Sequence, residues 1–459
     1  MPTIMVAALI VNDASIIEYV QKNNFAIQQS LNSSKAAEVG LLNVAKAPYE
    51  WTLISDITTT KDSTKSVPTF TKNDTTQHSG NLQFDKKWSI GLLSTLKYSH
   101  LQTNATGGYG LNNWLIGLEK SVYPSLENFS EKNSIQAATL NYSAAEIGAE
   151  LYRRAILRSQ LATFGNLQLM LLQIKENQTL LEKYQKIVKT VQRKKQNNFA
   201  LAGELEQATA EMKTREVNLK ELEMTYKNTL ELFYNDNNYQ NQTEIMISEP
   251  DFDLPLKIDK IVLSEKFPSE QHTIKSIKSI KSKNLQFEAA EFDLKATENE
   301  AKPKVSLFAS YGTQGLDSSL SESLQQSQKT EFNKYSFGIK LVHEFDSGRI
   351  GELNAYKRSE YLLSQRVKEN LESRIQQEIE LARMDLKLAL VQLESQTEIL
   401  NLRKQAVEQI TQNYNQGRID ISLLFDAYNK TVQGNIIRTD ALNNLRLKKF
   451  DFETILLTE

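Results

Sequence analysis

The most regular hydrophobic pattern lies in the last hundred or so residues of the chain. Between Glu352 and Tyr414 there is neither Pro nor Gly, and apolar residues recur at alternating steps of four and three. A sustained repeat of 3.5 residues keeps one face of a helix against a partner helix, as in a coiled coil. The residues of this seam are Ile375, Ile379, Ala382, Leu386, Ala389, Leu393, Leu400, Val407, Ile410 and Tyr414.

This seam predicts a helix over 347–415, with a length of roughly 100 Å at 1.5 Å per residue. Gly417 follows, and a second amphipathic pattern predicts a returning helix over 420–456. The C-terminal quarter is therefore expected to be a long antiparallel helical hairpin.

The same order of elements is found earlier in the chain. Helical patterns cover 125–196 and 202–234, and another helix is expected over 269–301, closed by Pro303. Between them, 235–268 holds three of the eight prolines and is read as an irregular equatorial linker.

Strands are predicted where the period of the pattern changes from about 3.6 to 2. Residues 62–110 are read as an insert between the two strands of the first half. Within this insert, Leu82 to His100 alternates in the manner of a strand, and in the second half 316–333 is read as a Ser/Gln-rich loop. The four principal strands are 49–60, 113–123, 305–312 and 335–345.

The chain is thus predicted to be an internal two-fold repeat. Each half runs from short helices through a strand, a polar loop and a second strand to a long helix, a turn and a shorter helix. The first repeat is 1–234, the linker is 235–268, and the second repeat is 269–459. The fold class is α+β, with helical hairpins and four strands per copy.

Composition removes several classes of function. The net charge is −2, which gives no electrostatic reason to expect a nucleic-acid partner. Cys is absent, so disulfides, Cys-bound metals and lipidation on Cys are excluded. The four His residues lack ligand spacing, and no phosphate loop or nucleophile motif appears. We therefore expect no enzyme activity, no metal and no cofactor.

The strands, by contrast, have the properties of membrane strands. Each is about ten residues long, which is enough to cross a bilayer at a tilt. Four strands cannot close a barrel, so a membrane role would require several copies to pool their strands. The other interpretation is a small soluble antiparallel sheet at the end of a helical stalk. Aromatic residues lie near the strand ends: Tyr49, Trp51, Trp114, Tyr123, Tyr311, Tyr335, Phe337 and Phe345.

Two stretches, taken with the repeat, resemble the TolC family of outer-membrane efflux proteins. Residues 335–349 end in Asp346-Ser-Gly348, similar to the strand-to-helix entry of the family. Residues 414–427 read Tyr-Asn-Gln-Gly-Arg-Ile-Asp-Ile-Ser-Leu-Leu-Phe-Asp-Ala, similar to its Tyr-x-x-Gly tip followed by Asp and Ala.

The resemblance implies a homotrimer in the outer membrane. Twelve strands would form one β-barrel in outer-membrane lipid, and twelve helices would continue it as an α-barrel in the periplasm. Such a channel is a passive exit duct for efflux or type I secretion. It would dock to a periplasmic adaptor protein and an inner-membrane pump or ABC transporter.

The resemblance also assigns roles at the two turns between helices. Asn198, Phe199, Gly417 and Arg418 would form the tips that adaptor hairpins grip. From the residues alone, these are ordinary helix-hairpin turns, because Gly and Asn are the residues that best adopt a positive φ.

Three residues near the tips match family positions of the periplasmic gate. Glu204 and Tyr414 would hold the mouth shut by a hydrogen bond between helices, and Asp426 would ring it with acid. The sequence departs from the family at Ile419, where a basic gate residue can stand, and at Leu423, where an acidic one can stand. The other interpretation makes Tyr414 a seam residue and both acids solvated.

A second class of function also remains open at this point. A structural coiled-coil protein, such as a surface stalk or adhesin with a small β head, would show the same periodicities without channel activity.

Overall fold

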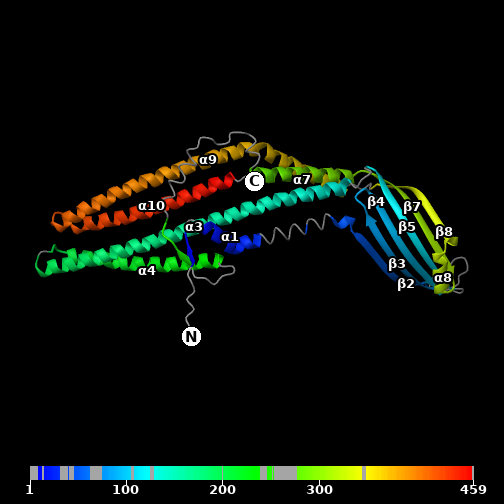
Figure 1. Ribbon diagram of the computed structural model, residues 1–459, viewed down its shortest axis with the longest axis horizontal. Helices are drawn as coiled ribbons and strands as arrows, with labels where there is room; N and C mark the ends of the chain where they lie inside the picture. The colour runs from blue at the N-terminus through cyan, green and yellow to red at the C-terminus, as the bar shows by residue number, and fades with distance from the viewer. Residues whose placement is uncertain are drawn as a thin grey trace, which may run out of the picture. The chain divides into compact units, whose positions relative to one another are not determined.

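The computed structural model places most of the chain in two compact units (Figure 1). The first contains 1–35, 145–282 and 370–459, and the second contains 36–144 and 283–369. Each unit therefore takes segments from both predicted repeats. The structure describes residues 9–12, 15–30, 40, 46–62, 75–104, 108–124, 129–198, 200–237, 245–250, 252, 277–343 and 348–456.

The long helices form as the heptad pattern predicts. Helix α3 (Phe129–Gln196) is followed by α4 (Glu204–Asn237), and α9 (Gly348–Asn415) by α10 (Ile421–Ile455). The helix α7 (Lys278–Glu300) precedes the second set of strands. Smaller elements are α1 (Ile16–Asn23), the 3-10 turn η1 (Ala47–Tyr49), β1 (Leu9–Val11) and β6 (Ile245–Ile247), the last two forming a parallel pair.

The helical unit has its apolar core between the hairpins. The seam predicted on α9 is buried at Leu386, Ala389 and Leu393, which pack against Leu442 and Leu445 of α10. A second cluster joins α1 to α3 and α4, and includes Ile16, Val20, Leu157, Phe164, Leu167 and Phe233. A third cluster lies near the tips of the hairpins.

Helices α3 and α10 approach each other closely at Gly165. A Cβ at this position would lie 2.9 Å from Cγ of Asn443. Instead, the Asn443 amide donates to the Gly165 carbonyl at 2.7 Å. A side chain at position 165 would displace Asn443 and disturb this hydrogen bond, so Gly suits this crossing.

The second unit contains an antiparallel sheet of six strands in the order β2-β3-β4-β5-β7-β8 (Figure 1). The pairing of β5 with β7 joins the two halves of the chain, because α3, α4 and α7 lie between these strands in sequence. The strands are β2 (Trp51–Asp62), β3 (Thr75–Lys87), β4 (Leu92–Thr103), β5 (Tyr109–Tyr123), β7 (Lys304–Asp317) and β8 (Asn333–Val342).

The expectation of four strands per copy is therefore wrong. The insert 62–110 contributes the additional hairpin β3–β4, which pairs on both sides. The alternation read from Leu82 to His100 continues through a tight turn at Trp88–Gly91, where Gly91 has a φ of 76°. Because the turn is only a few residues long, the period of 2 hides the reversal of the chain.

The prediction that 316–333 is a loop is wrong in part. It contains the helix α8 (Leu320–Gln328), capped by the Ser319 side chain, and a 3-10 turn, η2 (Thr330–Phe332). Helix α8 rests directly on β7, since a Cβ on Gly315 would lie 1.7 Å from the carbonyl oxygen of Ser323. The helix was missed because Ser and Gln dominate it and only two of its residues are Leu.

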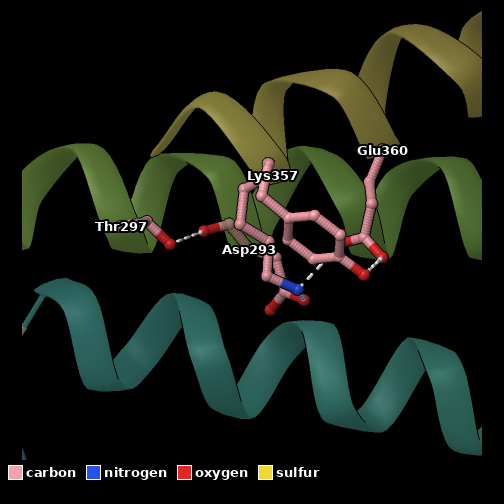
Figure 2. A network of polar contacts seen from close by, with 5 residues as sticks. Asp293, Thr297, Lys357 and Glu360 are labelled. Carbon is pink, nitrogen blue, oxygen red and sulfur yellow. Dashed lines mark hydrogen bonds and ion pairs between the residues drawn. The ribbon is translucent and has the colours of Figure 1, made fainter. Parts of the chain in front are cut away.

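Helices α7 and α9 are joined within this unit by a small polar network (Figure 2). Lys357 Nζ lies 3.2 Å from an Asp293 carboxylate oxygen on α7 and 2.9 Å from Glu360 on its own helix. Tyr356 donates to Glu360 at 2.9 Å, and Thr297 donates to the Asp293 carbonyl at 2.9 Å.

Among the described residues, none of the helices combines the length and the apolar composition that a membrane-spanning helix needs.

Candidate functional site

The tips of the two helical hairpins have the backbone conformation that the sequence predicts. Asn198 has a φ of 60° and Gly417 a φ of 69°. After α9, the N–H of Arg418 donates to the Asn413 carbonyl and that of Gly417 to the Tyr414 carbonyl, both at 2.9 Å. This pair of bonds is a Schellman motif, which satisfies the last carbonyls of the helix. Phe199, expected at the first tip, lies outside the described residues.

The helix after the second tip begins at a capped N-terminus. Asp420 accepts from the Ser422 backbone N–H at 2.7 Å. The hydrogen bonds to Ser422 hold the pKa of Asp420 below its usual range, so this cap stays ionised at neutral pH. The connection between α9 and α10, from Tyr414 to Ser422, is therefore held by hydrogen bonds at both ends.

Glu204 and Tyr414 lie together, although 210 positions separate them in sequence. The Tyr414 hydroxyl donates to Oε1 of Glu204 at 3.1 Å. Both side chains are buried, Glu204 at 7% and Tyr414 at 6% exposure. The second carboxylate oxygen of Glu204 accepts from the Leu201 backbone N–H at 3.1 Å. One buried carboxylate thus connects the start of α4 to the end of α9.

Lys194, which the sequence analysis did not select, completes this contact. Its Nζ lies 4.0 Å from Oε1 of Glu204 and 4.7 Å from the centroid of the Tyr414 ring. Burial, together with the Glu204 carboxylate, raises the pKa of Tyr414. The hydroxyl therefore keeps its proton at all ordinary pH values and remains a donor. We call Lys194, Glu204 and Tyr414 the tip latch.

Asp426 is not part of the tip latch. Its side chain is 54% exposed, and its carboxylate lies 2.6 Å from Lys430 Nζ, one turn along α10. Leu423 is 54% exposed, while Ile419 packs against the tip core. The structure thus brings together two of the three predicted gate residues and leaves Asp426 on the surface of α10. A gating role for any of them stays a prediction.

The tip latch rests on an apolar core drawn from α3, α4, α9 and α10. The rings of Tyr184 and Phe425 pack with their centroids 4.5 Å apart and their planes tilted by 60°. Because all four helices supply side chains, a change in the angle between the hairpins would disturb this core. Its buried residues are Leu180, Tyr184, Val191, Ala208, Tyr414, Ile421, Leu424, Phe425 and Tyr428.

A second polar cluster lies beside this core and was also missed. The Asn429 side-chain oxygen accepts from Arg215 at 2.6 Å and from the Tyr184 hydroxyl at 3.0 Å. Arg215 also donates to Asn177 at 3.3 Å. The cluster joins α3, α4 and α10. Only the polar interruption of the seam at Asn177 and Asn429 could have indicated it from the sequence.

The sheet of the second unit has two faces of opposite character. Its strand register places Leu53, Phe84, Leu96, Ile116, Tyr311 and Tyr335 in one row across all six strands. Neighbouring rows on the same face carry Trp51, Leu82, Tyr98, Trp114, Leu118, Leu307, Phe337 and Ile339. We call this the apolar face.

Large side chains on the apolar face are exposed. Phe337 is 84% exposed, Tyr335 75% and Ile116 56%. The opposite face of the same strands carries mainly hydroxyl, amide and charged side chains, and we call it the polar face. One of its rows is Thr52, Asp85, Thr95, Gly117, Ser310 and Ser336.

The side chains of the polar face are linked to one another by hydrogen bonds. Asp85 accepts from Thr95 at 2.7 Å, and Glu119 accepts from Ser306 at 2.6 Å. Lys340 lies 3.2 Å from Glu119. Such a face is satisfied in contact with water, whereas the apolar face is not.

Comparison with known proteins extends this picture. No protein-family model and no curated protein sequence matches the chain. Solved structures match along almost its whole length. The crystal structure of CusC, described with transmembrane channel formation, has a TM-score of 0.73 at 14% identity, covering 98% of this chain and 94% of that one.

Two further structures give similar values. The outer membrane protein VceC from Vibrio cholerae has a TM-score of 0.68 at 13% identity, covering 96% of this chain and 95% of its own. The open state of the Neisseria gonorrhoeae MtrE outer membrane channel has a TM-score of 0.68 at 11% identity, covering 96% and 88%. The chain therefore has the fold of the TolC family of outer-membrane channels, as its sequence motifs indicate.

Proposed function

We propose that this chain is the outer-membrane exit channel of an efflux system and works as a homotrimer. The sheets of three copies would join into one β-barrel in the outer membrane. The helical hairpins would continue the channel as an α-barrel through the periplasm. Cargo would pass down the centre, and the chain itself would catalyse nothing.

The two-faced sheet is the observation that carries this proposal. An apolar face of aromatic and aliphatic side chains crosses all six strands, while the polar face carries Ser, Thr, Asn, Lys and Asp. A membrane β-barrel requires this alternation, with apolar residues toward lipid and polar residues toward the lumen. The strands have 10 to 15 residues, enough to cross a bilayer at a tilt.

The tips of the hairpins are the proposed docking surface for a periplasmic adaptor. Gly417, Arg418 and Asn198 lie at the turns, and the tip latch lies directly behind them. Opening would separate α4 from α9, and in the latch this would break only the Tyr414–Glu204 hydrogen bond and the contact of Lys194 with the Tyr414 ring. An inner-membrane pump or ABC transporter would supply the energy, for drug efflux or for type I secretion.

The same observation argues against a surface stalk or adhesin. A soluble β head would place its apolar face against a core, whereas Phe337, Tyr335 and Ile57 are each more than 70% exposed. The amount of exposed apolar surface on this sheet is typical of contact with lipid or with another subunit.

Planar lipid bilayers test the channel directly. We expect the purified protein to give discrete conductance steps, and the double variant Tyr414→Phe/Glu204→Ala to raise the conductance because the latch is lost. Glu206→Ala removes an exposed carboxylate of the first turn of α4 that pairs with Lys195 and not with Tyr414, so it serves as the matched control and should leave the closed state unchanged. Absence of any conductance from correctly inserted protein would refute the channel, whereas unchanged conductance in the double variant would remove only the latch from gating.

A further inference from the structure

The two edge strands of the sheet carry the most exposed apolar side chains of the described residues. Ile57 on β2 is 87% exposed and Phe337 on β8 is 84% exposed. Within the described sheet, β2 pairs only with β3 and β8 only with β7, so each has one free edge. Long, exposed, apolar edge strands pair with further strands unless they are protected.

The two edges are suited to each other. The sheet is antiparallel throughout, and six is an even number of strands, so β2 and β8 run in opposite directions. If copies are arranged in a ring, β8 of one copy therefore meets β2 of the next in the antiparallel sense. A second copy of this chain is the partner that this geometry accepts.

The tilt of a closed barrel limits the register of that pairing. Membrane barrels tilt their strands by about 35–45°, and strands lie about 4.8 Å apart. Each strand is then displaced by about 1.0–1.4 residues relative to its neighbour, or about 6–8 residues over six strands. Apolar residues must remain on one face, which allows only an even displacement, so it is six or eight.

The displacement can be counted from the register of the sheet. Within one copy, Ser336 on β8 lies in the same row as Thr52 on β2. A displacement of six toward the end of β2 places Ser336 opposite Thr58, and a displacement of eight places it opposite Thr60. A displacement in the other direction would carry β8 beyond the start of β2, and no pairing would result.

With a displacement of six, all ten residues of β8 face residues 52–61 of β2. Ile57 then lies opposite Phe337, so the two most exposed side chains cover each other. On the polar face, Asp56 lies diagonally across from Lys340. Strand length and the pairing of Ile57 with Phe337 favour a displacement of six, whereas a displacement of eight would place Asp56 directly opposite Lys340.

We infer that β8 of each copy pairs with β2 of the next, which gives a β-barrel of six strands per copy. This inference rests on the proposed trimer, in which three copies of six strands make eighteen rather than the twelve expected from the family resemblance. Because barrel diameter grows with strand number, the barrel is about 1.5 times as wide as one of twelve strands. The hairpin β3–β4 therefore widens the barrel.

Cysteine cross-linking tests the pairing, because the chain has no Cys of its own. The double variant Thr58→Cys/Ser336→Cys tests a displacement of six, and Thr60→Cys/Ser336→Cys tests eight. Both residues of each pair lie on the polar face, where an oxidant or a short bismaleimide can reach them. Within one copy β2 and β8 lie at opposite edges, so only neighbouring copies can be joined.

We expect one of these two variants to convert most of the detergent-purified protein to covalent dimers and trimers on denaturing gels. The three single-Cys variants are controls and should stay monomeric on the gel. The decisive comparison is Ser99→Cys/Ser336→Cys, because Ser99 on β4 would meet β8 if only β4, β5, β7 and β8 formed the barrel.

The outcomes separate the two proposals. Cross-linking through Ser99, with none through Thr58 or Thr60, would overturn the barrel of six strands per copy and leave the trimeric channel standing. A protein that is monomeric in mild detergent and forms no cross-links in any variant would overturn both.

Discussion

The core at the hairpin tips and the apolar face of the sheet place their apolar side chains in opposite ways. At the hairpin tips, Leu424 and Ile421 are each 1% exposed and pack inside a core of four helices. In the sheet, Phe337 and Ile339 are 84% and 72% exposed on the apolar face. The same residue types thus lie inside the tip core and on the outside of the sheet.

The proposed channel would place these two regions in different solvents, the tips in water and the sheet in lipid. A unit surrounded by water gains free energy by burying apolar surface in its interior. A unit surrounded by lipid gains nothing from doing so, and instead must pair every backbone group and keep polar side chains away from the hydrocarbon.

Truncation in the tip core should have the largest effect. Leu424→Ala removes a buried side chain and leaves a cavity, at a cost of about 3 kcal/mol in the free energy of unfolding. Its neighbour Leu423 is 54% exposed, so Leu423→Ala is the matched control and should cost less than about 0.5 kcal/mol. Urea titration followed by helical circular dichroism measures both, and equal effects would contradict the described burial.

A charge on the apolar face should be nearly as costly. Ile116 lies in the middle of that face, and Lys at the midplane of a bilayer costs about 2–4 kcal/mol. Leu115→Lys, on the adjacent residue of the polar face, is the control and should fold normally. Assembly in outer-membrane fractions and resistance to denaturation on unheated gels measure both. If Ile116→Lys assembled as well as the control, the apolar face would not contact lipid.

Alkaline pH should weaken the tip core. Burial raises the pKa of Tyr184 to about 12, from 10.0 in the unfolded chain. Below pH 10 both states are protonated and this Tyr adds no pH dependence. Between pH 10 and pH 12 only the unfolded state loses its proton, so stability falls as pH rises, by about 2–3 kcal/mol.

Tyr184→Phe should therefore flatten the fall in thermal stability between pH 10 and pH 12. Tyr152 is 58% exposed, so Tyr152→Phe is the control. Its thermal stability should fall with pH as steeply as that of the unsubstituted protein. An identical slope in Tyr184→Phe would show that the hydroxyl is in contact with water.

The tip latch should give the smallest change in stability. Tyr414→Phe removes one hydrogen bond to a buried carboxylate that keeps the Leu201 N–H and Lys194, so we expect a loss of about 1–1.5 kcal/mol. Glu204→Gln keeps an acceptor for the Tyr hydroxyl and should lose less. Thermal denaturation of the two variants shows whether Tyr414 stabilises the tip through its hydrogen bond to Glu204 or only through the packing of its ring.

The helices could be predicted from the sequence because long helices leave a strong signal. The seam from Ile375 to Tyr414 repeats over many turns, and the predicted helix 347–415 differs by one residue from α9. The turn at Gly417 could be placed because a positive φ requires Gly or Asn. Element type is reliable where one period persists over a long segment.

The sheet was predicted less well because its signals are short. The hairpin β3–β4 is rich in polar residues, and its tight turn at Gly91 does not interrupt the alternation. Six strands per copy instead of four also raises the number of strands expected in a trimeric barrel from twelve to eighteen. Which residues meet across the tip could come only from the family resemblance, because Glu204 and Tyr414 are 210 positions apart and no local pattern connects them.

The most direct measurement is the extraction and size of the protein. The chain would be expressed with a signal peptide, the membranes fractionated, and the product sized with and without detergent. The account predicts a trimer in the outer-membrane fraction that needs detergent to stay in solution. A monomer or dimer that is stable in plain buffer would contradict it, because the apolar face of the sheet would then be in water, as in a surface stalk.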